Sequence, residues 1–344
     1  MFDLSKLDPS NFRQFILDTP TQFKTGVDLA KNAKVEGKFN SVTVSGMGGS
    51  ALPANLLRAY CNDLFSSDQN LKPFEIYINR SYSLPHESKP EGSLNIIASY
   101  SGNTEESLSS LEEVKSLGLP FIGLSSGGKI EEKCKEYGMP HIKLPIPYPN
   151  YQPRMGTGYF FGSIFQILVN QGLVPDLTGE FIDESKKFNG YMTDYEEKGK
   201  TLAQSLKGMT PVIYSSSRFK PTAMVWKIKM NENAKTPAFY NFFPELNHNE
   251  MVGFTNPQAK FFIIMLKDPD DNPRNLKRYE VTAQLLKKRG IPSEIIDMDG
   301  DSLFSKMFLS ITYADWASYY LALEYGQDPT PVAMVEDLKK ILAS

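Results

Sequence analysis

The chain is poor in the residues that hold structural metal ions or form disulfide frameworks. Among its 344 residues are two cysteines, Cys61 and Cys134, and three histidines, His86, His141 and His248. Two cysteines are too few for a disulfide framework or a structural zinc site, and they suit a reducing compartment. No two of the histidines have the spacing of zinc ligands. We therefore expect a protein that uses neither a metal ion nor a cofactor.

Long apolar runs and an excess of one charge are also missing. The longest purely apolar run, residues 261–266, is far too short to span a bilayer. Residues 1–6 contain no basic region that leads into an apolar core, so no signal peptide is expected. The 37 basic and 40 acidic residues leave a net charge of -3, which argues against nucleic acid and anionic membranes as partners. These absences predict a soluble, cytoplasmic protein.

Strand and helix patterns alternate along two stretches of the chain. In the first, strands are predicted at 41–45, 74–78, 95–99 and 120–124, and helices at 51–60, 105–117 and 129–137. In the second, strands are predicted at 211–214, 260–266 and 293–296, and helices at 221–230, 275–288, 303–325 and 331–342. Strands that alternate with helices at this spacing indicate parallel sheets covered by helices on both faces.

The length of the chain and a proline-rich stretch near its middle indicate two α/β domains. A proline-rich stretch at 145–153 marks a boundary, and an apolar helix is predicted at 156–169. We expect an N-terminal domain over 1–153, a connecting helical segment over 154–184 and a C-terminal domain over 185–344. The order of strand, serine-rich loop, proline, alanine and helix occurs at 41–56 and again at 211–224, which suggests a duplication.

A first candidate phosphate loop, Gly46-Met-Gly-Gly-Ser50, lies between a predicted strand and a predicted helix. Glycines let a backbone approach a ligand closely, and a helix N-terminus offers N–H groups to an anion. The motif matches neither the dinucleotide fingerprint nor the lysine-bearing P-loop, so no nucleotide is implied. A plain tight turn explains the same residues equally well.

A second loop, Ser99-Tyr-Ser-Gly-Asn-Thr104, places three hydroxyl groups after an apolar strand. Open α/β sheets bind ligands at the carboxyl ends of their strands. Hydroxyl groups and backbone amides can hold a phosphate dianion there without an adjacent cation. The alternative is that Thr104 caps the following helix, which would account for one hydroxyl but not for all three.

The second stretch of the chain contains a carboxylate and an imidazole in polar surroundings. Glu232 lies in the segment Lys229–Lys235, and His248 lies in a loop with Glu245, Asn247, Asn249 and Glu250. A carboxylate and an imidazole are the groups that a metal-free proton-transfer enzyme needs. The alternative is a helix end followed by a capped surface loop.

Five motifs occur in the order of a known family. They are Gly46-Met-Gly-Gly-Ser-Ala51, Ser99-Tyr-Ser-Gly-Asn-Thr-Glu105, Pro153-Arg-Met-Gly156, Glu232-Asn-Ala-Lys235 and Pro244-Glu-Leu-Asn-His-Asn-Glu250. On these residues the chain resembles the bifunctional phosphoglucose/phosphomannose isomerases, which consist of two sugar isomerase domains in tandem. The resemblance covers nearly the whole length of the chain.

The resemblance implies a role for each matching residue. The phosphate of the sugar would be bound by Gly49, Ser50, Ser99, Ser101 and Thr104. Glu232 would move the proton between C1 and C2, and Arg154 would stabilise the enediolate. His248 would help to open the sugar ring from the partner subunit. Lys339, or Lys340 as the alternative, would assist ring opening.

The implied activity is the interconversion of glucose 6-phosphate with fructose 6-phosphate, with mannose 6-phosphate also accepted. The route would be a metal-independent enediol, in a homodimer with shared active sites that serves glycolysis and gluconeogenesis. Two alternatives stay open, namely an isomerase of another phosphosugar and a non-catalytic phosphosugar sensor. Without the resemblance, Arg154 is also compatible with a surface residue beside prolines, and Lys339 with a solvated lysine at a helix end.

Overall fold

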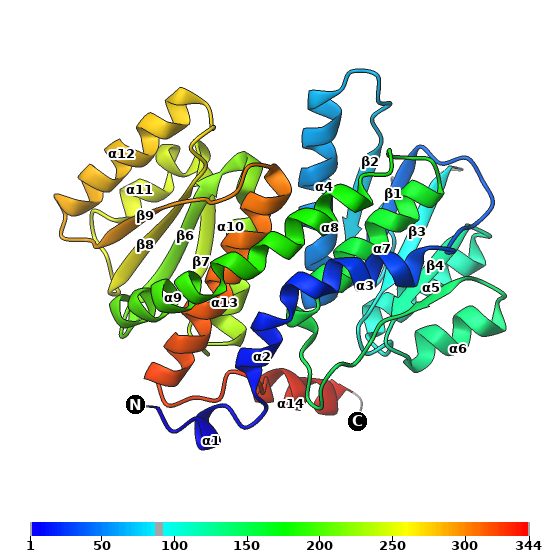
Figure 1. The fold of residues 1–344 in the computed structure, drawn as a ribbon, viewed down its shortest axis with the longest axis horizontal. Coiled ribbons are helices and arrows are strands. Elements are labelled where there is room, and N and C mark those ends of the chain that lie inside the picture. The colour runs from blue at the N-terminus through cyan, green and yellow to red at the C-terminus, as the bar shows by residue number, and fades with distance from the viewer. Residues whose placement is uncertain (1, 87–91, 343–344) are drawn as a thin grey trace. The chain divides into compact units, whose positions relative to one another are not determined.

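The computed structural model describes residues 2–86 and 92–342, which form two compact units (Figure 1). One unit is Asp18–Asn189, and we call it the N-terminal unit. The other combines Met1–Leu17 with Gly190–Ser344, and we call it the C-terminal unit. The expected connecting segment 154–184 lies inside the N-terminal unit, whereas the first residues of the chain pack with the C-terminal unit.

The N-terminal unit is built on a five-stranded parallel sheet with the order β2-β1-β3-β4-β5. Its strands are β1 (Ser41–Ser45), β2 (Glu75–Asn79), β3 (Ser93–Ala98), β4 (Phe121–Ser125) and β5 (His141–Lys143). Its helices are α3 (Thr19–Ala30), α4 (Gly48–Ser67), α5 (Glu105–Ser116), α6 (Gly128–Glu136), η2 (Pro153–Met155), α7 (Thr157–Asn170) and α8 (Thr178–Lys187). Every residue of β3 and β4 is buried, as is usual for central strands of a sheet covered on both faces.

Helices α3 and α7 approach each other closely because small residues line their contact. A Cβ atom at Gly26 would lie 2.4 Å from the carbonyl oxygen of Tyr159. The Ser163 hydroxyl of α7 donates a hydrogen bond of 2.9 Å to the Gly26 carbonyl of α3. This packing explains why residues 157–170 belong to the N-terminal unit and do not form a separate connector.

The C-terminal unit has a four-stranded parallel sheet with the order β7-β6-β8-β9. Its strands are β6 (Thr210–Ser216), β7 (Phe239–Phe243), β8 (Phe261–Lys267) and β9 (Ser293–Asp297). Its helices are α1 (Leu4–Leu7), α2 (Phe12–Leu17), α9 (Met192–Leu206), η4 (Ser217–Phe219), α10 (Lys220–Glu232), η5 (Glu245–His248), α11 (Glu250–Gly253), α12 (Pro273–Lys287), α13 (Leu303–Glu324) and α14 (Ala333–Leu342). The short helix η3 (Phe188–Tyr191) precedes α9.

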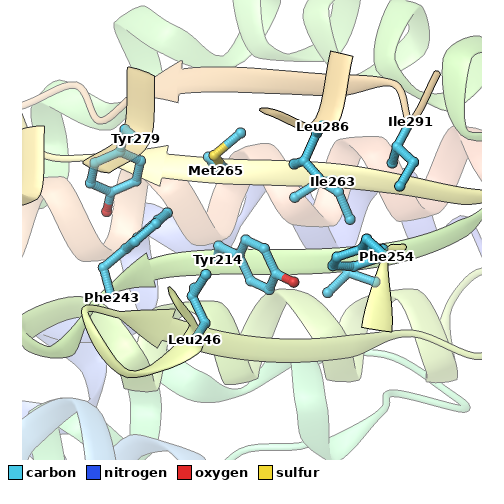
Figure 2. Packing of buried hydrophobic residues seen from close by; sticks show 10 residues of the cluster. Tyr214, Phe243, Leu246, Phe254, Ile263, Met265, Tyr279, Leu286 and Ile291 are labelled. Carbon is cyan, nitrogen blue, oxygen red and sulfur yellow. The ribbon is translucent and has the colours of Figure 1, made fainter. Parts of the chain in front are cut away.

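Helices cover both faces of this second sheet. On one face, α11 and α12 close over a cluster that includes Tyr214, Phe243, Met265 and Tyr279 (Figure 2). The rings of Phe243 and Tyr279 lie 4.4 Å apart, measured between their centroids. On the other face lie α9 and α13, with α10 packed against α13 (Figure 1). The indole nitrogen of Trp226 in α10 donates to a hydroxyl of α13, so even the polar atom of this buried ring is satisfied.

Polar contacts attach the first residues of the chain to the C-terminal unit. Asp8 accepts hydrogen bonds from the Phe12 backbone amide at 2.5 Å and from the Tyr319 hydroxyl of α13 at 3.0 Å. The Arg13 guanidinium forms a two-pronged ion pair with Glu196 of α9, with N–O distances of 2.7 and 2.6 Å. Tyr319 lies 311 residues from Asp8, and Glu196 lies 183 residues from Arg13, so local patterns do not reveal these two contacts.

The predicted fold class is confirmed, because the chain forms two parallel sheets, each flanked by helices. The predicted strands 41–45 and 293–296 agree closely with β1 and β9. Helix α4 begins at Gly48, three residues before the expected start, and helices α2 and α9 were not predicted. Within the described residues, no helix combines the length and the apolar character that a membrane span requires.

Candidate active site

The glycine loop and the hydroxyl loop meet at the carboxyl edge of the first sheet. Strands β1 and β3 are direct neighbours, although β2 lies between them in the chain. The order of the strands therefore reverses between β1 and β3, and such a switch point is where open α/β sheets bind ligands. Helix α4 begins two residues after β1 ends, and the loop Ser99–Thr104 connects β3 to α5.

Ser50 ties the two loops together. Its hydroxyl oxygen accepts a hydrogen bond of 2.9 Å from the backbone amide of Tyr100. Gly46 allows the close approach, because a Cβ atom there would lie 2.7 Å from the Ala98 carbonyl oxygen. The Tyr100 hydroxyl donates to the Pro145 carbonyl at 2.6 Å, and burial raises the pKa of this hydroxyl above its usual value. Ser50 thus lies in a pre-organised, largely buried position.

Ser99 and Thr104 form a second hydroxyl pair at the same edge. Their side-chain oxygens lie 2.8 Å apart, and the Gly102 amide donates to the Ser99 oxygen at 3.2 Å. Thr104 stands directly before α5, but its side chain makes no capping hydrogen bond to that helix. Thr104 thus occupies the N-cap position, where its carbonyl accepts from the Leu108 amide at 3.0 Å, but its hydroxyl bonds to Ser99 and not to the helix. Ser101 differs from the other two, because it is exposed and accepts from the Asn103 amide at 3.3 Å.

Gly49 brings the first turn of α4 against the segment that carries Arg154. A Cβ atom at Gly49 would lie only 2.7 Å from the Arg154 backbone nitrogen. Arg154 is 1% exposed, and its guanidinium donates to the Gln152 side-chain oxygen at 3.0 Å. The alternative of a surface arginine is therefore wrong. A guanidinium is rarely buried without partners, so the burial of Arg154, whose backbone packs against the first turn of α4, indicates a built cationic position.

The donors of this edge suit an anion. Within the described residues no side chain caps the N-terminus of α4 or α5; in α4 the Ser50 amide donates to the Met47 carbonyl at 3.0 Å. Helix N-termini carry a partial positive charge and bind phosphate groups. The hydroxyls of Ser50, Ser99 and Thr104 lie beside these N-termini. We call this set of groups, together with Gly49, the hydroxyl cradle.

A buried glutamine that the sequence patterns did not single out supports this site. Gln22 of α3 donates to the Tyr151 hydroxyl at 3.0 Å and to the Met155 carbonyl at 2.9 Å. Its side-chain oxygen accepts from the Gly158 amide at 3.1 Å. The segment around Arg154 is therefore held by one side chain from about 130 residues earlier. The only signal in the sequence was a glutamine among apolar residues of an amphipathic helix.

Glu232 is the last residue of α10, and its surroundings fix the end of that helix. The Lys235 ammonium donates to the Glu232 carbonyl at 2.6 Å and to the Pro329 carbonyl at 2.9 Å. The Asn233 side chain donates to the Ser318 hydroxyl at 2.9 Å. One turn earlier, the buried Lys229 ammonium lies 2.7 Å from an Asp315 carboxylate oxygen. The half-buried Glu232 therefore stands on a well-anchored backbone.

His248 is the last residue of η5, the turn that follows β7. Its imidazole is exposed and makes no hydrogen bond to any residue in the described part of the chain. The neighbours on either side are bound to the unit: Asn247 to α12, and Glu250 to strands β6 and β7. The loop therefore presents one imidazole to the outside.

Glu232 and His248 lie on opposite sides of the second sheet. Because β6 and β7 are parallel, α10 must return from the carboxyl edge to the amino edge, so Glu232 ends up at the amino edge. His248 follows β7, whose five residues span roughly 17 Å, at the carboxyl edge. In addition, α10 packs with α13 on one face, whereas η5 packs with α12 on the other. One unit therefore does not bring these two side chains together.

Lys339 and Lys340 lie on α14, a helix without buried residues. The Lys339 ammonium pairs with Glu336 at 2.8 Å, and the Lys340 ammonium lies 3.6 Å from Asp337. Both partners are on α14 itself, so these ion pairs hold each lysine to its own helix and not to Glu232 or His248. Among residues 2–86 and 92–342, no three side chains of His, Cys, Asp or Glu lie close enough to hold a metal ion together.

Comparisons with known proteins identify relatives along almost the whole chain. Residues 195–342 match the family model described as the bacterial phospho-glucose isomerase C-terminal SIS domain. A bifunctional phosphoglucose/phosphomannose isomerase from Caldicellulosiruptor bescii is 35% identical over 346 residues, covering 95% of this chain and 98% of the relative. A D-glucosamine-6-phosphate 4-epimerase from Sulfolobus acidocaldarius is 32% identical, covering 70% of this chain and 71% of the relative.

Solved structures share the fold at much lower identity. A glucosamine-6-phosphate deaminase from Thermotoga maritima matches with a TM-score of 0.68 at 14% identity, covering 93% of this chain and 96% of that one. At this level of identity the likeness supports the two-sheet α/β fold and nothing finer.

Proposed function

Because this chain belongs to the bifunctional phosphoglucose/phosphomannose isomerase family, we propose that it interconverts glucose 6-phosphate and mannose 6-phosphate with fructose 6-phosphate. The observation that carries the proposal is the hydroxyl cradle, with the buried Arg154 against the first turn of α4. A cradle of neutral donors at a strand switch point fits the phosphate group that all three sugars share.

In the proposed reaction, the hydroxyl cradle binds the phosphate and leaves the sugar carbons to the catalytic residues. Glu232 removes the proton from one carbon and returns it to its neighbour, which requires a single positioned base. Arg154 stabilises the negative charge that develops on the enediolate oxygen, so no metal ion is required. His248 and Lys339 assist ring opening. We place this chemistry in the cytoplasm, where the two buried cysteines stay reduced.

We further propose a homodimer with shared active sites. Its support is the separation of Glu232 and His248 by the second sheet, since both can serve one substrate only if they come from different copies. A closed two-fold dimer is also the commonest assembly of soluble proteins.

A coupled assay with glucose 6-phosphate and mannose 6-phosphate as separate substrates tests the activity, with fructose 6-phosphate measured as the product. Conversion of both is expected, and it should continue after exhaustive chelation with EDTA. Glucosamine 6-phosphate is tested in parallel, with its C4 epimer measured as the product by chromatography or NMR, because the relative from Sulfolobus acidocaldarius makes 4-epimerisation the second candidate. Turnover of that sugar alone, with no fructose 6-phosphate formed from the other two, would replace the proposal.

Subunit mixing tests the shared sites. Glu232→Gln and His248→Ala homodimers are each expected to retain only a small residual activity, and exchange of subunits between them should restore activity well above it. In a shared site, each mixed dimer has one pocket with both lesions and one pocket with neither. No recovery, despite independently measured subunit exchange, would show that the two residues act within one subunit.

A further inference from the structure

Glu250, two residues after His248, connects the His248 loop to two strands of the sheet. The Tyr214 hydroxyl of β6 donates a hydrogen bond of 2.6 Å to one carboxylate oxygen of Glu250. The Asn241 side-chain amide of β7 donates to the other oxygen. Hydrogen bonds to an ionised acceptor are stronger than those between neutral groups. The two hydrogen bonds to the Glu250 carboxylate therefore attach the loop firmly to the sheet.

The buried donor strengthens this attachment. Tyr214 is fully buried within the cluster of Figure 2, and burial raises its pKa above the usual value, with the Glu250 charge acting in the same direction. Its hydroxyl therefore stays protonated and remains a donor at neutral pH. Because a buried donor without its acceptor is costly, the position of Glu250 is strongly favoured over detached arrangements of the loop.

A second attachment lies immediately before the histidine. The Asn247 side chain donates to the Thr282 hydroxyl at 3.0 Å and accepts from the Arg278 guanidinium at 3.1 Å, both on α12. The Asn249 side-chain oxygen accepts from the Glu250 amide at 2.6 Å. Of the polar residues at 247–250, only His248 makes no hydrogen bond to any described residue.

We propose that Glu250 is the positioning residue for His248: its carboxylate, held by Tyr214 and Asn241, fixes the loop so that the imidazole projects at one place. The positioning of the loop stands on these contacts alone. Its consequence for catalysis rests on the proposed function of His248. Fixed geometry matters because a small misplacement of a catalytic group can cost about 10²-fold in rate.

The positioning is tested without any activity measurement, by NMR of histidine ring signals. The chain has only three histidines, and His248→Ala assigns the signal of interest. Glu250→Gln keeps the size of the side chain but replaces one carboxylate oxygen by an NH2 group. This group cannot accept the hydrogen bond that Tyr214 or Asn241 donates to that oxygen. It should shift and broaden the His248 signal while the His86 and His141 signals stay unchanged. An unchanged His248 signal would overturn the proposal.

The consequence for catalysis is tested by a double-mutant cycle. Glu250→Gln should lower kcat by about tenfold with little change in KM. In a His248→Ala background, the same substitution should change kcat by less than about twofold, because the group that it positions is gone. An equal loss in both backgrounds would mean that Glu250 acts on the fold and not through His248, and it would overturn this part of the proposal.

Two further variants keep the outcome interpretable. Tyr214→Phe removes one of the two donors and should produce a weaker effect of the same kind, which covers the case that Glu250→Gln folds poorly. Glu280→Gln, on the exposed surface of α12, is the matched control and should leave the His248 signal and kcat unchanged. Full activity of His248→Ala would refute the proposed role of His248 itself, and the NMR result would then decide the positioning separately.

Discussion

The carboxyl edges of the two sheets have the same topology but different chemistry. In both sheets the strand order reverses between two central neighbours, β1 and β3 in one unit and β6 and β8 in the other. In the N-terminal unit, the loops after these strands supply hydroxyls and backbone amides. In the C-terminal unit, they supply Arg218 and Asp268, which pair with each other at 3.1 Å.

The second edge is neutralised by its own charges. Asp268 is fully buried and accepts from the Lys306 ammonium of α13 at 2.6 Å, and Asp270 binds the same ammonium at 2.6 Å. Burial lowers the pKa of Lys306, but the hydrogen bonds to both carboxylates outweigh it and raise the pKa overall. The Asp268 carboxylate thus pairs with Arg218 and Lys306, the two cations of this edge that could otherwise attract a phosphate. The comparison teaches that a switch point binds an external anion only where its donors are left unoccupied.

The largest expected effect is the loss of stability when Asp268 is removed from the ion pairs at the second carboxyl edge. Asp268→Ala leaves the buried Lys306 with only the exposed carboxylate of Asp270, so the free energy of unfolding should fall by about 3–5 kcal/mol. Urea denaturation of the purified variant measures the change. Asp270→Ala is the matched control, since its carboxylate is exposed, and it should change stability little. Equal losses in the two variants would contradict the assignment of Asp268 as the central counter-ion.

A second prediction tests whether the C-terminal unit supplies the chemistry. Glu232→Gln keeps the shape of the side chain but removes its ability to accept a proton, so turnover should fall by about 10²-fold or more. Binding of sugar phosphate should persist, because the hydroxyl cradle is untouched. Steady-state kinetics and calorimetric titration together measure both quantities. Glu197→Gln, on the exposed side of α9, serves as the control, and near-normal turnover of Glu232→Gln would exclude this residue as the base.

A third prediction tests whether the N-terminal unit supplies the binding. Thr104→Ala removes one cradle hydroxyl and the partner of Ser99, so KM should rise by about tenfold, with a smaller change in kcat. Ser101→Ala should have a weaker effect, because Ser101 is exposed and bound to its own loop. Arg218→Ala in the C-terminal unit should leave KM unchanged. A larger effect of Arg218→Ala than of Thr104→Ala would reverse the division of roles between the units.

The smallest expected effect is a pH dependence of stability that comes from His141 of the N-terminal unit. Burial lowers the pKa of His141 below 6.5, and its ring nitrogen lies 2.7 Å from the Ser125 hydroxyl. The unfolded chain therefore binds the proton more readily than the folded one. The stability from the neutral ring is fully present above about pH 6.5 and is lost as the pH falls through that value towards the lower folded pKa.

Thermal melts between pH 7.5 and pH 5 (roughly one unit either side of the histidine range) measure this dependence. His141→Gln should flatten the loss of stability on the acid side, whereas His86→Gln, at an exposed position, should leave the slope unchanged. An identical slope in the wild type and in His141→Gln would show that the buried ring does not contribute.

Much of the fold could be predicted from the sequence because its signals are local. The β-branched segment 41–45 and the apolar run 261–266 predict strands, and the glycine-rich loop after residue 45 predicts a helix start at the carboxyl edge. The identities of the cradle residues followed from the same local patterns and from the family motifs. Helix α2 and the Gln22 contacts were out of reach, because their partners lie about 130 to 310 residues away along the chain.

The sequence by itself determined the α/β class, the alternation of strands and helices along the chain and the residues from which a phosphosugar site could be built, since periodicity and turn chemistry act over a few residues. Only the tertiary structure decided that the Thr104 hydroxyl bonds to Ser99 and makes no capping bond to the helix, and that Arg154 is buried. It also decided that a sheet separates Glu232 from His248, although His248 follows Glu232 by only sixteen positions in the numbering. Parallel strand pairing carries the chain from one edge of the sheet to the other between these residues, so closeness in sequence becomes distance in space.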